Sequence, residues 1–139
     1  MIVLIDTNVV LDLLIQRAPF YEDAAKINIL SEKGYIRSYM SASAVTDIYY
    51  IARKEIGNEE AVTALLENLL KTISVASVTE VSIHEALELK WEDFEDAVQY
   101  VVGQGVSAEY IVTRNPDDFK SSQIPVISPK NFLRKLGLE

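Results

Sequence analysis

The order of elements in this 139-residue sequence predicts an α/β fold, a three-layer α/β/α sandwich with helices on both faces of a central parallel sheet. Two observations predict it. Short, continuous apolar runs, typical of strands buried on both faces, alternate with longer segments of helical periodicity. Hydrophobic residues make up 49% of the chain, and no linker, internal repeat or low-complexity tract divides it. We therefore expect a single domain over residues 1–139, with a sheet of four to five short strands.

The chain opens with a strand signal and two helix signals. Residues 2–5 are an apolar run with β-branched members, which is typical of a buried strand. From Val9 to Leu14 the apolar residues recur at helical spacing. A second helix is predicted over about 20–33, and Gly34 is its expected stop.

The middle of the chain repeats the alternation. Residues 35–40 predict a second strand. Ser41 or Ser43 would cap the helix that follows, which is expected to end at Gly57, and Asn58 would cap a fourth helix.

The remaining segments continue in the same order. Each strand is a short apolar run, and each helix begins after a capping residue or a proline. The predicted elements are a strand over 73–78, a helix capped by Thr79 that runs to about Lys90, a helix over 94–103, strands over 109–113 and 124–127, and a terminal helix opened by Ser128-Pro129.

Charge and composition limit the possible functions. The net charge of −8 opposes binding of nucleic acid by electrostatics alone, unless cations neutralise the acids or a basic partner docks. The absence of cysteine excludes disulfides, thiolate nucleophiles and Cys-ligated zinc. No basic leader precedes Asp6, and no stretch approaches the ~18 apolar residues of a membrane span. We expect a cytoplasmic protein that does not enter a membrane.

Acidic residues follow several of the predicted strands. Asp6 comes directly after the first strand, and Asp47 lies in the opening turns of the helix after the second. Asp93 and Asp96 bracket the start of a later helix, and residues 113–119 leave the carboxyl end of another strand. In parallel α/β sheets, sites form beyond the carboxyl ends of the strands. These acids are therefore candidates for one shared site.

Two interpretations of these acids remain open on spacing alone. Clustered carboxylates repel unless a cation neutralises them, and Mg²⁺ and Mn²⁺ prefer oxygen ligands. Such a site could orient a phosphodiester and activate water. Any one of these acids, however, is more often a helix cap than a metal ligand.

Four local strings resemble the motifs of the PIN-domain family, and specifically its VapC-type toxins. They occur in the family's order between residues 2 and 119. The strings are Ile2-Val3-Leu4-Ile5-Asp6-Thr7-Asn8-Val9, Ser41-Ala42-Ser43-Ala44-Val45-Thr46-Asp47-Ile48-Tyr49-Tyr50, Asp93-Phe94-Glu95-Asp96-Ala97, and Tyr110-Ile111-Val112-Thr113-Arg114-Asn115 with Asp118-Phe119.

The resemblance implies a PIN-like fold and an endoribonuclease that hydrolyses RNA phosphodiester bonds with Mg²⁺ or Mn²⁺. It implies the toxin of a toxin–antitoxin pair, with RNA as substrate, a protein antitoxin as partner and a homodimeric state. The metal-binding and catalytic residues implied are Asp6, Asp47, Asp96 and Asp118. The supporting residues implied around them are Thr7, Asn8, Ser41, Asp93, Thr113 and Asn115.

Two positions depart from the family pattern. Asp47 stands where Glu is usual, and its carboxylate reaches roughly 1.5 Å less far, so it would bind metal directly or through water. Asn115 stands where many relatives have Asp, so Asp117 or Asp118 would supply the missing carboxylate. We favour Asp118, because an Asp before Phe recurs in toxin-like members.

Other functions remain as alternatives. The chain could be a PIN-fold module, weakened in catalysis, that binds RNA or protein. An aspartyl-phosphate enzyme is less favoured, because its second Asp would fall at Asn8. Arg114 would hold a phosphate or lie at the surface. Asp12 would face either the same cleft or solvent and is not among the predicted site residues.

Overall fold

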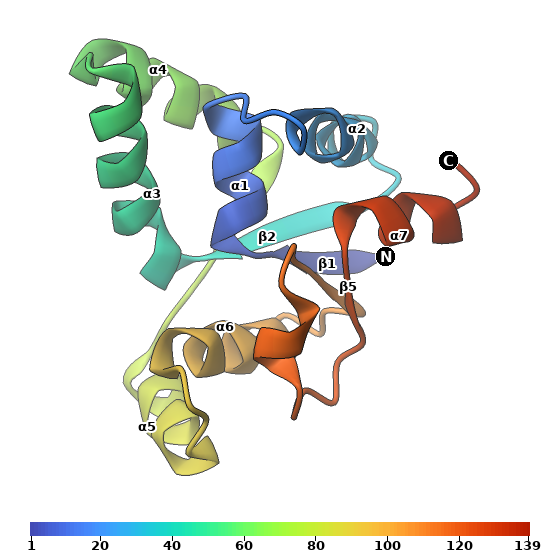
Figure 1. Cartoon of the computed structure of the whole chain (residues 1–139). Coiled ribbons are helices and arrows are strands. Elements are labelled where there is room, and N and C mark those ends of the chain that lie inside the picture. Colours follow the sequence, from blue (N-terminus) through green and yellow to red (C-terminus); the bar gives the residue numbers. More distant parts are fainter.

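The computed structural model describes residues 1–139 and has a five-stranded sheet in the order β3-β2-β1-β4-β5. All four strand pairs are parallel. Helices cover both faces of this sheet, which confirms the predicted α/β/α sandwich (Figure 1). The strands are β1 (Ile2–Ile5), β2 (Arg37–Ser41), β3 (Ile73–Ala76), β4 (Tyr110–Val112) and β5 (Val126–Ile127).

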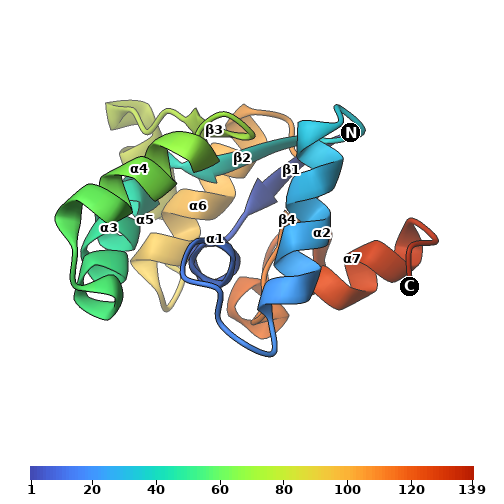
Figure 2. The ribbon, with the colours of Figure 1, turned by 90° about the horizontal axis from the view of Figure 1, so that it is seen from above.

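The helices divide into two layers, as the two views together show (Figures 1 and 2). One face of the sheet carries α1 (Thr7–Leu14), α2 (Tyr21–Glu32), α3 (Ala42–Ile56), α4 (Glu59–Leu69) and α7 (Pro129–Lys135). The other carries α5 (Glu80–Leu89), α6 (Phe94–Gly105) and the short 3₁₀ helix η1 (Pro116–Phe119).

The central strand β1 contributes to both layers. Its side chains alternate between the two faces of the sheet. Val3 and Ile5 belong to the core under α1, α2 and α3, whereas Leu4 packs with Ile111 of β4 in the core under α6. Burial on both faces is the reason that residues 2–5 are apolar without interruption.

Gly103 allows α6 to lie close to the sheet. A Cβ atom at this position would be 3.4 Å from side-chain atoms of both Leu4 and Ile124. The close approach matters for the site, because α6 also carries Asp96 and Gln99.

The chain reverses its direction of travel across the sheet at β1. From β1 it moves to β2 and β3 on one side, and then returns to β4 and β5 on the other. The connections leaving β1 and β4 therefore diverge, and the carboxyl ends of these neighbouring strands border a crevice of the kind in which α/β proteins bind ligands. The backbone N–H of Asp6 donates to the carbonyl of Val112 across this point, at 3.0 Å.

The predicted caps are confirmed. Ser41, Asn58, Thr79 and Ser128 each accept a backbone N–H at the start of a helix. Gly57 ends α3 in the left-handed conformation, with φ of 74°.

Several strand limits differ from the prediction. The strand expected over 35–40 is Arg37–Ser41, and the one expected over 73–78 ends at Ala76. Their limits follow pairing, because Arg37 is the first residue of β2 in register with β1 and Ala76 is the partner of Ser41. The strands expected over 109–113 and 124–127 are likewise shorter, at Tyr110–Val112 and Val126–Ile127, and the helix expected over 94–103 continues to Gly105. The turn of 3₁₀ helix at η1 was not predicted.

None of the helices combines the length and the apolar character that a membrane crossing requires.

Candidate active site

Asp6 is the first residue beyond β1 and is 6% exposed. It is the N-cap of α1, and its Oδ1 accepts the N–H of Thr7 at 2.7 Å. The same oxygen accepts Nε2 of Gln99 at 2.8 Å, while Oδ2 accepts the hydroxyl of Thr113 at 2.7 Å. A cap needs only the first of these bonds. The other two come from the residue after β4 and from α6, and they hold the carboxylate in one orientation.

Thr113 connects Asp6 to the loop after β4. Its buried hydroxyl donates to Asp6 and accepts the backbone N–H of Asn115 at 3.0 Å and the side-chain amide of Asn8 at 3.4 Å. Oδ1 of Asn8 in turn accepts the backbone N–H of Arg114 at 3.3 Å. The predicted supporting residues Thr113 and Asn8 thus join the carboxyl ends of β1 and β4.

Gln99 is a buried site residue that the sequence analysis missed. It lies on α6 between apolar neighbours, three residues after Asp96 and on the same helical face. A polar residue within an apolar helical run was the available signal. Its Oε1, like Oγ1 of Thr7, is buried and has no hydrogen-bond partner.

Asp96 is the second central carboxylate, in the first turn of α6. Burial, reinforced by the negative charges of Asp93, Asp6, Asp118 and Glu95, raises its pKa to about 7. Asp93 is the N-cap of α6, and its Oδ1 accepts the N–H of Asp96 at 3.0 Å. Acidic side chains are therefore concentrated around the start of α6.

Two cavities open onto these acids. One, of about 370 Å³, is lined by Asp6, Asp96 and Gln99 together with two arginines. The other, of about 790 Å³, extends past Trp91 and two lysines. Asp93, Asp96 and Asp118 line both cavities.

The segment after β4 places one of its acids in the same cavity as Asp6 and Asp96. Phe119 is buried against Trp91, with ring centroids 6.1 Å apart, and so anchors η1. Asp118 lines both cavities, whereas Asp117 lines only the larger one and Asn115 only the smaller. Of the two acids in this segment, only Asp118 lines the cavity that contains both Asp6 and Asp96.

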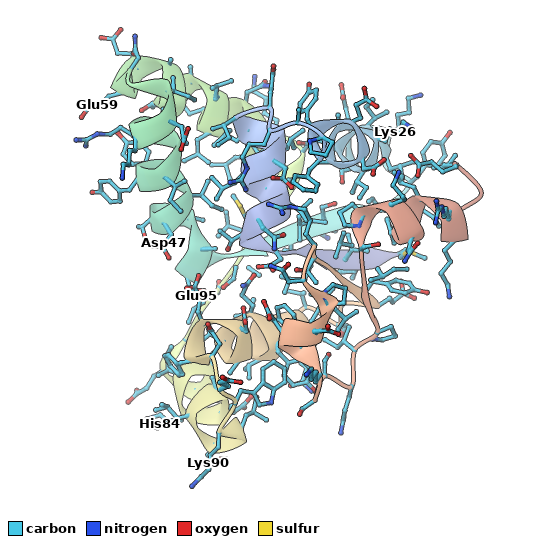
Figure 3. The ribbon with its side chains drawn as sticks, viewed as in Figure 1. Lys26, Asp47, Glu59, His84, Lys90 and Glu95 are labelled. Carbon is cyan, nitrogen blue, oxygen red and sulfur yellow. The ribbon has the colours of Figure 1, made fainter.

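Asp47 lies apart from these cavities. It is exposed on α3 and lines neither of them. It lies opposite Glu95, the second residue of α6, which is not among the predicted site residues (Figure 3). Burial, followed by the charges of Asp47, Asp93 and Asp6, raises the pKa of Glu95. Glu95 lines the smaller cavity and so extends the acidic surface toward Asp47.

Of the predicted supporting residues, Thr7 lies at the site and Ser41 does not. Thr7 lines the smaller cavity. Ser41 is buried at the end of β2, where it accepts the N–H of Ser43 as the cap of α3, and it lines neither cavity.

The residues present fit a hard divalent cation. No three acidic or histidine side chains come close enough together to enclose a metal ion. Mg²⁺, however, usually keeps several waters and takes only one or two carboxylates from a protein. Two features suit such an ion. The carboxylates of Asp6 and Asp96 lie in one cavity, where a cation would relieve the repulsion between them. The buried oxygens of Thr7 and Gln99 have no hydrogen-bond partner.

Comparison with known proteins gives one family match and several structural matches. The sequence profile of the PIN domain family matches residues 2–117. No curated protein matches the sequence as a whole.

Three similar structures cover most of this chain. VapBC2 from Rickettsia felis, bound to a DNA fragment from its promoter, has a TM-score of 0.69 at 16% identity and covers 91% of this chain and 97% of its own. VapC20 of Mycobacterium tuberculosis, a toxin that cleaves the sarcin-ricin loop, has a TM-score of 0.68 at 17% sequence identity. The match covers 86% of this chain and 94% of VapC20. A chain of a toxin–antitoxin complex from Klebsiella pneumoniae has a TM-score of 0.67 at 22% sequence identity. The match covers 91% of this chain and 97% of that chain. At these identities the likeness establishes the fold.

Proposed function

The chain belongs to the PIN-domain family, and from this premise we propose that it is a Mg²⁺- or Mn²⁺-dependent endoribonuclease, the toxin of a toxin–antitoxin pair. The observation that carries the proposal is Asp6. Three donors from three elements hold its carboxylate beside the crowded carboxylate of Asp96. A helix cap needs no such arrangement, whereas a metal ligand does.

In this proposal Asp6 and Asp96 bind the cation, and Asp118 completes the site from η1. Asp47 acts from α3, either through water or through its neighbour Glu95. When bound, the cation lowers the pKa of a coordinated water and neutralises charge on the phosphate.

The other residues keep the carboxylates in position. Thr113 and Gln99 prevent the Asp6 side chain from rotating away, since each donates to a different oxygen. Asp93 orders the first turn of α6 and so sets the position of Asp96.

The proposal includes partners and location. Of the similar structures, one is a toxin that cleaves RNA and two hold a toxin with its antitoxin, which supports RNA as substrate and a protein antitoxin as inhibitor. A basic antitoxin segment would suit the net charge of −8. A homodimer of single-domain subunits, acting in the cytoplasm, is the assembly we propose.

The test is cleavage of total cellular RNA in Mn²⁺, with and without EDTA. Total RNA is used because an arbitrary oligonucleotide would lack the cleavage site of a toxin that cuts at a single sequence. We expect discrete fragments that disappear with EDTA and with Asp6→Asn. Glu67→Gln, which removes an exposed acid on α4 outside both cavities, is the matched control and should keep most activity. Full activity of folded Asp6→Asn would refute the proposal.

One observation favours a second candidate, a PIN-fold module that binds RNA or protein without cutting. Asp47 lies outside the cavities, and no three acids enclose a metal ion. Metal-independent RNA binding by the folded protein, with no cleavage in Mn²⁺, would support this candidate instead.

A further inference from the structure

Asp12, on α1, is a buried carboxylate that the proposed reaction does not use. It is 1% exposed, and two arginines donate to it. Nε of Arg17 is 2.9 Å from Oδ1, while Nε of Arg114 is 2.7 Å from Oδ2 and its Nη2 is 3.2 Å from Oδ1. A buried carboxylate needs a charged partner, but one guanidinium would balance its charge. The second leaves this cluster with an excess positive charge.

Both arginines are held in place by further contacts. Nη2 of Arg17 donates to the carbonyl of Asn8 at 3.2 Å. The guanidinium of Arg114 lies over the ring of Phe20, 3.9 Å from its centroid. Nη1 of each arginine has no hydrogen-bond partner. The two side chains are 36% and 26% exposed, so both reach solvent at the rim of the cavity.

The arginine pair lines the same cavity as Asp6 and Asp96. A phosphodiester that approaches these carboxylates meets repulsion, and a cation between them relieves only part of it. Two guanidinium groups at the rim provide a counter-charge and donors that match the non-bridging oxygens of a phosphate. Their excess charge contrasts with a chain whose net charge is −8.

We infer that Arg17 and Arg114 form a phosphate-binding pair for the RNA backbone, and that Asp12 positions both guanidiniums. The inference rests on the proposed function, since it concerns the substrate of the same site. Arg17 and Arg114 touch the RNA, whereas Asp12 acts only through them.

The test measures binding of a short, fluorescently labelled single-stranded RNA by anisotropy. Calcium replaces the catalytic metal, and a gel checks that the RNA stays intact. Arg17→Gln and Arg114→Gln should each bind about tenfold more weakly, as expected for loss of a charge-assisted hydrogen bond. Each should also lower the slope of log K against log salt by about 0.7, because one phosphate contact is lost.

Arg37→Gln is the matched control. Arg37 is exposed at the amino end of β2, at the opposite edge of the sheet, so its loss removes the same charge away from the cavity. It should leave affinity and salt slope unchanged. Equal effects of all three substitutions, or no measurable binding by the wild-type protein, would overturn the inference.

Two further readouts separate binding from folding and from catalysis. Thermal unfolding of each variant shows whether it is folded at the assay temperature, and a binding loss explained by unfolding would make the cluster merely structural. Asp12→Asn keeps both positive charges but should still weaken binding when folded. In cleavage assays the arginine variants should raise KM about tenfold more than they lower kcat. Arginine-dependent binding of RNA without any cleavage would refute the proposed nuclease function but would still support Arg17 and Arg114 as a phosphate-binding pair.

Discussion

At the scale of single residues, the hydroxyl of Thr113 makes three hydrogen bonds, to Asp6, Asn8 and Asn115. We expect Thr113→Val to reduce cleavage at least tenfold, because Asp6 loses the donor that orients Oδ2. The substitution also leaves the N–H of Asn115 without its acceptor, so the free energy of unfolding should fall by about 1–3 kcal/mol. Initial rates and urea denaturation measure the two effects.

Thr63→Val is the control for this substitution, because Thr63 is exposed on α4, away from the site. It should change neither quantity appreciably. Activity equal to the wild type in Thr113→Val would show that Asp6 does not depend on this bond.

Asp96 gives the metal-free protein a pH dependence. Its pKa is raised to about 7 in the folded state, against about 3.9 in an unfolded chain. Between these values the folded state binds more protons, so the contribution of Asp96 to stability falls as pH rises from about 4 to 7. Asp96→Asn should therefore gain stability relative to the wild type across this range. Urea denaturation in EDTA at several pH values tests this, and a constant difference would contradict it.

Some residues of the site could be predicted from a short stretch of sequence, and others could not. Asp6, Asp96 and Asp118 could be proposed because each lies in a local string, and the structure brings all three to one crevice. Gln99 was missed because its hydrogen-bond partner at the site, Asp6, is distant in the chain. Asp6 and Gln99 are 93 residues apart, and no local pattern encodes such a contact.

At the scale of elements, the packing of α6 on the sheet depends on Gly103. A methyl group fits there at ordinary contact distance, but a larger side chain would meet Leu4 and Ile124. Gly103→Val should therefore cost about 1–3 kcal/mol by overpacking and displace Asp96 and Gln99 from Asp6. Gly103→Ala should be tolerated.

Gly105→Ala is the matched control for this prediction, since nothing lies within 4 Å of a Cβ at that position. Chemical denaturation and cleavage rates would be measured together. Activity retained in a destabilised Gly103→Val variant would show that the site tolerates displacement of α6.

Helix limits were more predictable than strand limits for a physical reason. A helix start depends on a capping residue next to it, and Ser41, Asn58 and Thr79 were each predicted from that signal. A strand limit depends on a partner strand far along the chain. Tyr35 looks like strand but lies outside β2, because β1 offers no partner before Ile2. The turn at η1 depends on Phe119 finding its place beside Trp91.

At the scale of the whole molecule, the net charge of −8 makes stability sensitive to divalent cations. Mn²⁺ at about 100 times its dissociation constant should add about 2.7 kcal/mol to the free energy of unfolding. The melting temperature should rise accordingly in the wild type. Asp6→Asn should lose most of this rise, while Glu67→Gln on α4 should keep it, and scanning calorimetry measures both. An equal rise in all three proteins would indicate diffuse screening without a defined site.

The central place of β1 in the sheet has a consequence for the protein during its synthesis. β1 leaves the ribosome before both of its neighbours, and Thr113, the partner of Asp6 across the crevice, follows it by 107 residues. Until β4 and Thr113 emerge, the carboxylate of Asp6 lacks its hydrogen-bond donor from that side and remains solvated. For the nuclease proposed above, we therefore expect no cleavage of RNA by the nascent chain until the residues after β4 have been translated.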